Sequence, residues 1–395
     1  MGSYKSWFFH SIVKRNTRRN FIEKVLKEDG SYTENQHQVA EEFIQFYTQL
    51  LGSSSPVQAL DSAIIREGPL VSLEQASTLT RDITTQEIKD ALFSIGDDKS
   101  PGPDGYTSCF FKKSWAIVQS DFVGAIKELF TSSWLLKQMN NMVIALIPES
   151  SHSNAVGDYR PIACCNVFYN VITKILAYRL GPILVDIIDQ AQATFVEGRS
   201  MVENIHLPQE LLRQYNQKSV SPRCVFKIDL RKAYDSISWE FLKGILQGLC
   251  IPTKFVNWAM ECVTTPMYSI ASNGSLHGFF KGGRDSEFNF HPKHGPLKIT
   301  HLAFADDLML FARGDVLSVK ILVQCLNIFG TTSGLKMNIL KSSLYTARIH
   351  GVELEQIQEL TSMSKDTTPF RYLGIAELIG QFAKEWNVFY RPFSL

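Results

Sequence analysis

An acidic pair between two apolar runs is the feature that most constrains how this chain can fold. In ITHLAFADDLMLFA (299–312), Asp306 and Asp307 separate LAFA from LMLFA. Short apolar runs of this kind are typical of buried strands. Ordinary turns carry Gly, Asn or Pro, and this connection has none of them. We therefore expect a hairpin that carries two neighbouring carboxylates between its strands.

A third carboxylate ends another apolar run. Asp229 closes VFKID (225–229), which is also typical of a strand. A carboxylate beside apolar residues is costly unless its charge is compensated, and adjacent carboxylates repel each other. Oxygen ligands of this kind suit Mg²⁺ or Mn²⁺. Asp229, Asp306 and Asp307 therefore predict a site for two such ions, which would serve a hydrolase or a transferase equally well.

Charge and cysteine content exclude several classes of protein. Lys and Arg total 40 and Asp and Glu total 39, a net charge of +1, so any site for a polyanion must be local. Seven cysteines without a C-x-x-C pair argue against a disulfide scaffold and a structural zinc site, and favour a reducing compartment. No apolar run approaches the length of a membrane span, so we expect no membrane contact.

Local patterns predict helices and strands in no regular alternation. Residues 52–72 are marked by Ser, Gly and Pro and indicate a linker. We expect a strand over 142–148, helices over 114–130 and 239–249, a helix after Pro161, helices capped by Thr84 and Asp315, and an amphipathic helix bearing Val39, Phe43, Phe46, Tyr47 and Leu50 on one face. Without a repeated βαβ unit, the fold class is α+β rather than doubly wound.

Several blocks of the sequence together resemble a known family. FADD (304–307), preceded by FKIDLRKAYDSISW (226–239), resembles the reverse transcriptases of non-LTR, LINE-type retrotransposons, most like those of plants. The further blocks that agree, in the family's order, are KSPGPDGY (99–106), DYRPIACCNVFYNVITKILAYRL (158–180), QATFVEGRSMVENI (192–205), SGLKMNILKSSLY (333–345) and FRYLGI (370–375). The resemblance covers most of residues 6–375.

The resemblance implies a fold and its parts. We expect the fingers and palm of a right-hand polymerase within the α+β class. Residues 1–72 would form a connector region before the polymerase, 73–220 the fingers, 221–375 the palm and 376–395 a divergent tail. The implied activity is RNA-directed DNA polymerisation with an RNA template, a DNA primer, deoxynucleotides and two Mg²⁺ or Mn²⁺ ions. A nuclear location is implied by the family alone.

The resemblance also implies roles for individual residues. Asp229, Asp306 and Asp307 would be the catalytic, metal-binding carboxylates. Four other residues would bind the incoming nucleotide, and they are Arg199, Arg160, Tyr234 and Lys341. The arginines suit phosphate oxygens. Tyr234 would exclude a 2′-hydroxyl, or alternatively packs in the core. Lys341 would neutralise or protonate the leaving pyrophosphate, or alternatively is a surface lysine.

One block of the family pattern is missing. The family carries a block close to R-G-L-R-Q-G-D-P-L-S-P, with a following helix, between the first Asp and the FADD hairpin. Here GFFKGGR (278–284) leads directly into DSEFNFHPKHGPLK (285–298), so a few tens of residues are absent near 284–285. The alternative function is therefore a catalytically inactive retrotransposon remnant that binds nucleic acid. A Mg²⁺-dependent phosphohydrolase fits the carboxylates alone, and an intron-type maturase shares the blocks.

Overall fold

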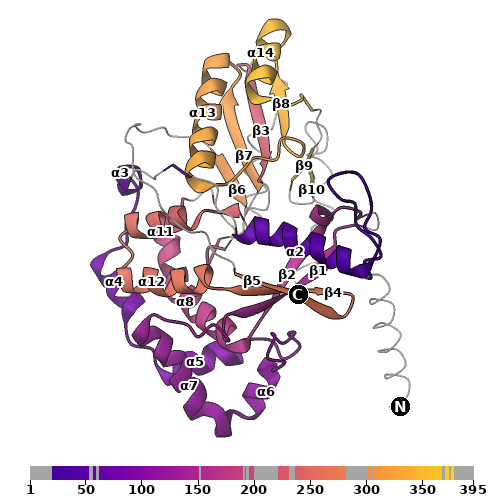
Figure 1. Cartoon of the computed structure of the whole chain (residues 1–395). Helices are drawn as coiled ribbons and strands as arrows, with labels where there is room; N and C mark the ends of the chain where they lie inside the picture. Colours follow the sequence, from indigo (N-terminus) through magenta and orange to yellow (C-terminus); the bar gives the residue numbers. More distant parts are fainter. Residues whose placement is uncertain are drawn as a thin grey trace, which may run out of the picture. The chain divides into compact units, whose positions relative to one another are not determined.

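The structure, a computed structural model, describes residues 20–52, 57–58, 62–150, 153–189, 192, 195–199, 221–230, 236–281, 301–304, 307–366, 370–372 and 375–377. Helices and strands are mixed, which confirms the α+β class (Figure 1). The chain divides into two compact units, each built from separate stretches of sequence. The first unit comprises 1–55, 72–180 and 250–288, and the second comprises 56–71, 181–249 and 289–395.

A four-stranded sheet forms the centre of the first unit. Its strand order is β2-β1-β4-β5. The bounds are β1 Asn141–Pro148, β2 Tyr159–Cys165, β4 Met267–Ser272 and β5 Ser275–Lys281. β1 pairs antiparallel with β2 and parallel with β4, while β4 and β5 form a hairpin. The expected strand over 142–148 is confirmed, and its buried side chains alternate along it as Met142, Ile144 and Leu146.

Helix α2 (Gln36–Gly52) belongs to the same core as this sheet. Its buried residues Val39, Phe43 and Tyr47 pack with Ile144 of β1 and Ile270 of β4. They recur at a spacing of four residues, which places them on one helical face. The expected amphipathic helix is therefore confirmed, with the remaining predicted residues, Phe46 and Leu50, packed at the margin of the core.

The other helices of the first unit are α4 (Leu73–Thr80), α5 (Thr85–Phe93), α6 (Ser108–Lys113), α7 (Trp115–Ser132), the 3₁₀ turn η1 (Val156–Asp158) and α12 (Thr253–Thr264). Helix α8 (Val167–Ile187) begins in this unit and ends in the second. Of the capping box expected from Thr84 and Glu87, the Thr84 half is confirmed, because its hydroxyl accepts the Glu87 amide at 3.1 Å, whereas the Glu87 side chain bonds Arg179 and Arg81 instead. The rings of Phe130 on α7 and Trp258 on α12 pack edge to face, with their centroids 4.9 Å apart.

The second unit contains the other four-stranded sheet, whose order is β6-β7-β3-β8 and whose pairs are all antiparallel. The strands are β3 (Arg223–Asp229), β6 (His301–Phe304), β7 (Asp307–Arg313) and β8 (Ser343–Ala347). The remaining elements are α3 (Ser62–Arg66), α11 (Trp239–Gly248), α13 (Val316–Ser333), α14 (Gly351–Thr361), β9 (Phe370–Tyr372) and β10 (Ile375–Glu377). The core of this unit includes Phe226, Ile228 and Leu310 from the sheet and Val319 and Leu322 from α13.

Helix α13 has the length and composition that would allow it to cross a membrane, as the one such helix within the described ranges. Its buried residues Val319 and Leu322 pack into the core of the sheet, while Leu317, Ile328 and Phe329 are exposed. Asp315 caps its first turn, as predicted, by accepting the Ser318 amide at 2.8 Å.

The structure corrects two local expectations. The chain after Pro161 was expected to be helical, but β2 continues to Cys165 and α8 begins only at Val167. Because β2 is an edge strand, the missing N–H of Pro161 costs little there. The helical face is as predicted, since Val171, Ile175 and Leu176 are buried. The expected linker over 52–72 contains the short helix α3.

The two units do not follow contiguous stretches of sequence. β4 and β5 lie within 221–375 but join the sheet of the first unit through the parallel β1–β4 pairing. The contiguous fingers (73–220) and palm (221–375) segments therefore remain a proposal, as do the connector 1–72 and the tail 376–395.

Candidate active site

The predicted acidic hairpin is present in the sheet of the second unit. Strands β6 and β7 pair antiparallel, with Phe304 opposite Asp307, and both expected strands are confirmed. Asp306, together with Ala305, lies outside the described residues, and the side chain of Asp307 is also not described. β3 pairs with β7 in a register that sets Asp229 opposite Asp307. Two of the three predicted carboxylate positions are thus backbone neighbours.

The backbone at Asp229 is held by a loop from further along the chain. The Asn338 amide donates to the Asp229 carbonyl at 2.8 Å, and the Asp229 amide donates to the Ser342 hydroxyl at 3.1 Å. An isolated bridge between Leu230 and Met337 extends this contact. Both main-chain polar groups of Asp229 are therefore satisfied, which fixes the strand end from which its half-buried side chain projects.

Sequence reasoning did not single out Asn338 and Ser342. Both residues lie in SGLKMNILKSSLY (333–345), a block that resembles the family, but the resemblance assigns no role to either of them. Lys341 lies in the same loop, where its amide donates to the Asn338 carbonyl at 3.0 Å and its side chain is exposed. Lys341 is thus brought near the strand end that carries Asp229 through a loop that both share.

The donor set at this strand end suits a divalent cation. Carboxylate oxygens are the ligands that Mg²⁺ and Mn²⁺ prefer, and like charges at directly opposite positions of an antiparallel pair repel. Asp229 and Asp307 occupy such positions. Among the side chains that the structure describes, no group of three His, Cys, Asp or Glu residues forms a metal cluster, and those of Asp306 and Asp307 are not among them.

Arg199 is engaged in capping a helix. Its guanidinium donates to four main-chain carbonyls at and beyond the end of α8, those of Val185, Ile188, Asp189 and Gln192. The last carbonyls of a helix have no partner within it, so these bonds stabilise the end of α8. Contact between Arg199 and a triphosphate stays a prediction, and it would require some of these bonds to be exchanged.

The other two predicted nucleotide ligands lie in different settings. Arg160 is on β2 in the first unit, where its Nε donates to Glu149 Oε1 at 3.2 Å and both side chains are exposed. An exposed ion pair of this kind contributes little to stability. Tyr234 lies outside the described residues. Neither position tests the predicted role.

The loop 99–106 is held in place by Asn166, at the junction of β2 and α8. Asn166 is 3% exposed; its Oδ1 accepts the Asp104 amide at 3.2 Å, and its Nδ2 donates to the Gln138 carbonyl at 3.0 Å. Gly102 passes so close that a Cβ there would lie 2.3 Å from Asn166 Oδ1. This position therefore requires glycine because the loop backbone packs directly on the junction.

Comparison with known proteins defines the class. The family model for reverse transcriptase (RNA-dependent DNA polymerase) matches residues 147–376, more than half of the chain and a range that contains Asp229, Asp306 and Asp307. The chain therefore belongs to the reverse transcriptase family.

The chain is also similar to proteins of transposable elements. The chain is 25% identical over 364 residues to the Transposon TX1 uncharacterized 149 kDa protein of Xenopus laevis, covering 86% of this chain and 28% of that protein. It is 25% identical over 329 residues to the Retrovirus-related Pol polyprotein from type-2 retrotransposable element R2DM of Drosophila melanogaster, covering 74% and 30%. The chain spans less than a third of the length of either relative.

Proposed function

We propose that this chain is the RNA-directed DNA polymerase part of a LINE-type, plant-like retrotransposon, acting on an RNA template, a DNA primer and deoxynucleotides. The observation that carries the proposal is the register of β3 on β7, which sets Asp229 opposite Asp307 within the range matched by the reverse transcriptase family. A hydrolase would need the same carboxylates, but the family match extends well beyond them and favours the polymerase.

In the proposed mechanism, Asp229, Asp306 and Asp307 would hold two divalent cations, which would supply activation of the primer 3′-hydroxyl and neutralisation of the leaving pyrophosphate. The loop contacts of Asn338 and Ser342 hold the backbone of Asp229, so that its carboxylate keeps its place during the reaction. Lys341 on the same loop is proposed to donate a proton or a positive charge to the pyrophosphate. Arg199 and Arg160 are proposed to bind phosphate oxygens, and Tyr234 to exclude a ribose 2′-hydroxyl.

The proposal includes the fingers-and-palm organisation and the missing block near 284–285. A palm helix of ordinary size buries about 400 Å² of apolar surface, or about 10 kcal/mol at ~25 cal/mol per Å². Because a domain is stable by only about 5–15 kcal/mol, losing such a helix would weaken the palm severely. The second candidate follows from this same gap: a catalytically inactive remnant that binds nucleic acid through its fingers.

Primer extension tests the proposal. Purified protein would receive poly(rA)–oligo(dT), dTTP and Mg²⁺, beside Asp229→Asn and the matched surface variant Asp121→Asn on α7. We expect extension by the native chain and by Asp121→Asn, and none by Asp229→Asn. If the folded native chain extends no primer, the polymerase proposal fails. Salt-sensitive RNA binding without extension would then identify the remnant.

A further inference from the structure

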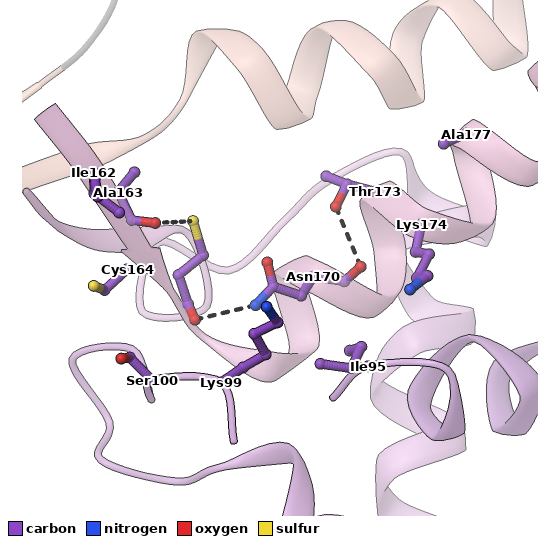
Figure 2. Close-up of a pocket in the computed structure, with 11 residues that line it drawn as sticks. Ile95, Lys99, Ser100, Ile162, Ala163, Cys164, Asn170, Thr173, Lys174 and Ala177 are labelled. Carbon is purple, nitrogen blue, oxygen red and sulfur yellow. Dashed lines mark hydrogen bonds between the residues drawn. The ribbon is translucent and has the colours of Figure 1, made fainter. Parts of the chain in front are cut away.

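A pocket in the first unit lies outside the carboxylate site. It is open to the surface, has a volume of about 650 Å³, and is lined by the loop at Lys99 and Ser100, the end of β2 and the first half of α8 (Figure 2). Part of its wall is apolar, including Ile95 and Ile162. The hydrogen bonds of Asn166 fix the loop against β2, so the pocket is a built feature of this unit.

The pocket is cationic. Lys99 and Lys174 both line it, and no acidic residue is among its lining residues. Lys174 Nζ donates to the Ser94 carbonyl at 3.3 Å, a neutral partner. The ion pairs found among the described side chains include neither lysine. Lys99 and Lys174 thus offer two positive charges to a small molecule with carboxylate groups, with the Asp98 carboxylate also close to the Lys99 side chain beside Gly96.

Two adjacent cysteines of β2 line the same pocket, and they differ in chemistry. The thiol of Cys165 contacts the Ala163 carbonyl at 3.8 Å, and burial, followed by the charge of Cys164, raises its pKa to about 11. In Figure 2 the sulfur of Cys164 points away from that contact. Both cysteines are partly exposed, and the thiol of Cys165 is the one held against a carbonyl. A disulfide exchange reaction needs a thiolate with access, so Cys164 is the better nucleophile of the two.

The strand that carries these cysteines can also pair with a peptide. β2 is an edge strand of its sheet, with β1 on one side and no strand on the other among the described residues. The free side of an edge strand offers main-chain donors and acceptors to an extended peptide. Two lysines, a thiol and an edge strand thus line one pocket, although the Cys165 carbonyl at the end of that strand already accepts Asn170 Nδ2 at 3.3 Å.

We propose that this pocket binds an anionic peptide disulfide of the oxidised glutathione type, and that Cys164 is the residue it modifies. The Cys164 thiolate attacks one sulfur of the disulfide; a new S–S bond forms between Cys164 and one glutathionyl group. The original S–S bond breaks, and the other half leaves as a thiolate that takes up a proton from water. Lys99 and Lys174 pair with the carboxylates of the bound peptide. This inference is independent of the polymerase proposal, because its readout is a covalent bond.

Peptide mass mapping after exposure to two disulfides tests the proposal. Full-length native protein would be treated with oxidised glutathione or with cystamine, a cationic disulfide, and modification would be followed at each cysteine. Cys250, which is exposed and does not line the pocket, is the comparison cysteine. We expect oxidised glutathione to modify Cys164 faster than Cys250, and cystamine to reverse that order.

Three variants complete the test. Cys164→Ser should abolish the fast modification, and Cys165→Ser, the matched neighbour, should leave it unchanged. Lys99→Gln/Lys174→Gln should slow the reaction of Cys164 with oxidised glutathione about fivefold, as expected for the loss of two exposed ion pairs. Added salt should shrink the difference between the two reagents. Equal rates at Cys164 with both disulfides, or no effect of the lysine double variant, would overturn the proposal.

Discussion

The buried ion pair of Arg179 with Glu87 gives a demanding test of the first unit. The Arg179 side chain is 2% exposed, and its guanidinium meets both carboxylate oxygens of Glu87, at 2.8 and 3.0 Å. Its other N–H groups donate to the carbonyls of Leu79, in the last turn of α4, and of Arg81 and Asp82, between α4 and α5. All five donors are used, so α8 is joined to two other segments of the unit through one side chain.

Replacing Arg179 with Met keeps an apolar stem of similar length but removes five hydrogen bonds, and leaves Glu87 paired with the more exposed Arg81, which donates to Glu87 Oε1 at 3.2 Å. Breaking a buried ion pair from one side costs about 3–5 kcal/mol, and we expect Arg179→Met to destabilise the first unit by that amount. The exposed pair of Arg160 with Glu149 supplies the control, since Arg160→Met should cost less than about 1 kcal/mol.

The same pair predicts a dependence on pH. Burial by itself would raise the pKa of Glu87, but the hydrogen bond and charge of Arg179, together with the charge of Arg81, outweigh it and lower that pKa. The stabilisation is therefore present above the ordinary Glu pKa of about 4.3, and it is lost as pH falls through the lowered value. Arg179→Met should lack this acid-sensitive part of its stability.

Urea unfolding combined with hydrogen exchange of peptides from α5 and α8 would measure these effects, because two units need not unfold together. The protection of backbone amides in α5 and α8 against hydrogen exchange should fall in Arg179→Met and stay near the native level in Arg160→Met. If both variants lost the same small amount, or if Arg179→Met kept the native acid dependence, the reasoning about the buried pair would be refuted.

Two further predictions concern local packing and capping in the first unit. Gly102→Ala should cost about 1–3 kcal/mol, because its Cβ would overlap Asn166, whereas Gly124→Ala in α7, with open space around it, should be neutral or stabilising by up to about 1 kcal/mol. Thr84→Ala should cost about 1 kcal/mol through the lost cap of α5, and the neighbouring Thr85→Ala should cost much less. The midpoint of urea unfolding would be measured for all four variants. Equal losses of stability in the two glycine variants would contradict the packing argument, and equal losses in the two threonine variants would contradict the capping argument.

Features set by a few neighbouring residues could be predicted from the sequence. The apolar runs flanking Asp306 and Asp307 were sufficient to predict β6 and β7, and the caps at Thr84 and Asp315 follow from side-chain chemistry within one turn. The start of α8 was predicted too early, because Pro161 was interpreted as the beginning of a helix. Whether a proline begins a helix or lies on an edge strand depends on which strands pair around it.

Features set by distant residues could not be predicted in this way. Neither the sequence of β1 nor that of β4 indicates that these two strands pair in parallel. The bonds of Arg199 to the end of α8 depend on how the chain after that helix turns back. At the candidate site, the residue types were predictable, but the contacts of Asn338 and Ser342 with Asp229 require a loop more than 100 residues further along the chain.

The parallel β1–β4 pairing has a consequence for how this protein folds during its synthesis on the ribosome. Between these two strands the chain contributes β3, with Asp229, to a different sheet. During synthesis β1 and β3 are therefore both made before β4, the parallel partner of β1. Pairings between strands so distant in sequence form slowly. Asn140, which is fully buried, meets its partners Cys262 and Thr265 only at that late stage. Before β4 is synthesised, the edge of β1 that β4 later covers is unpaired. Whether the nascent chain folds or aggregates therefore depends on how the rate of synthesis through β4 compares with the rate of aggregation.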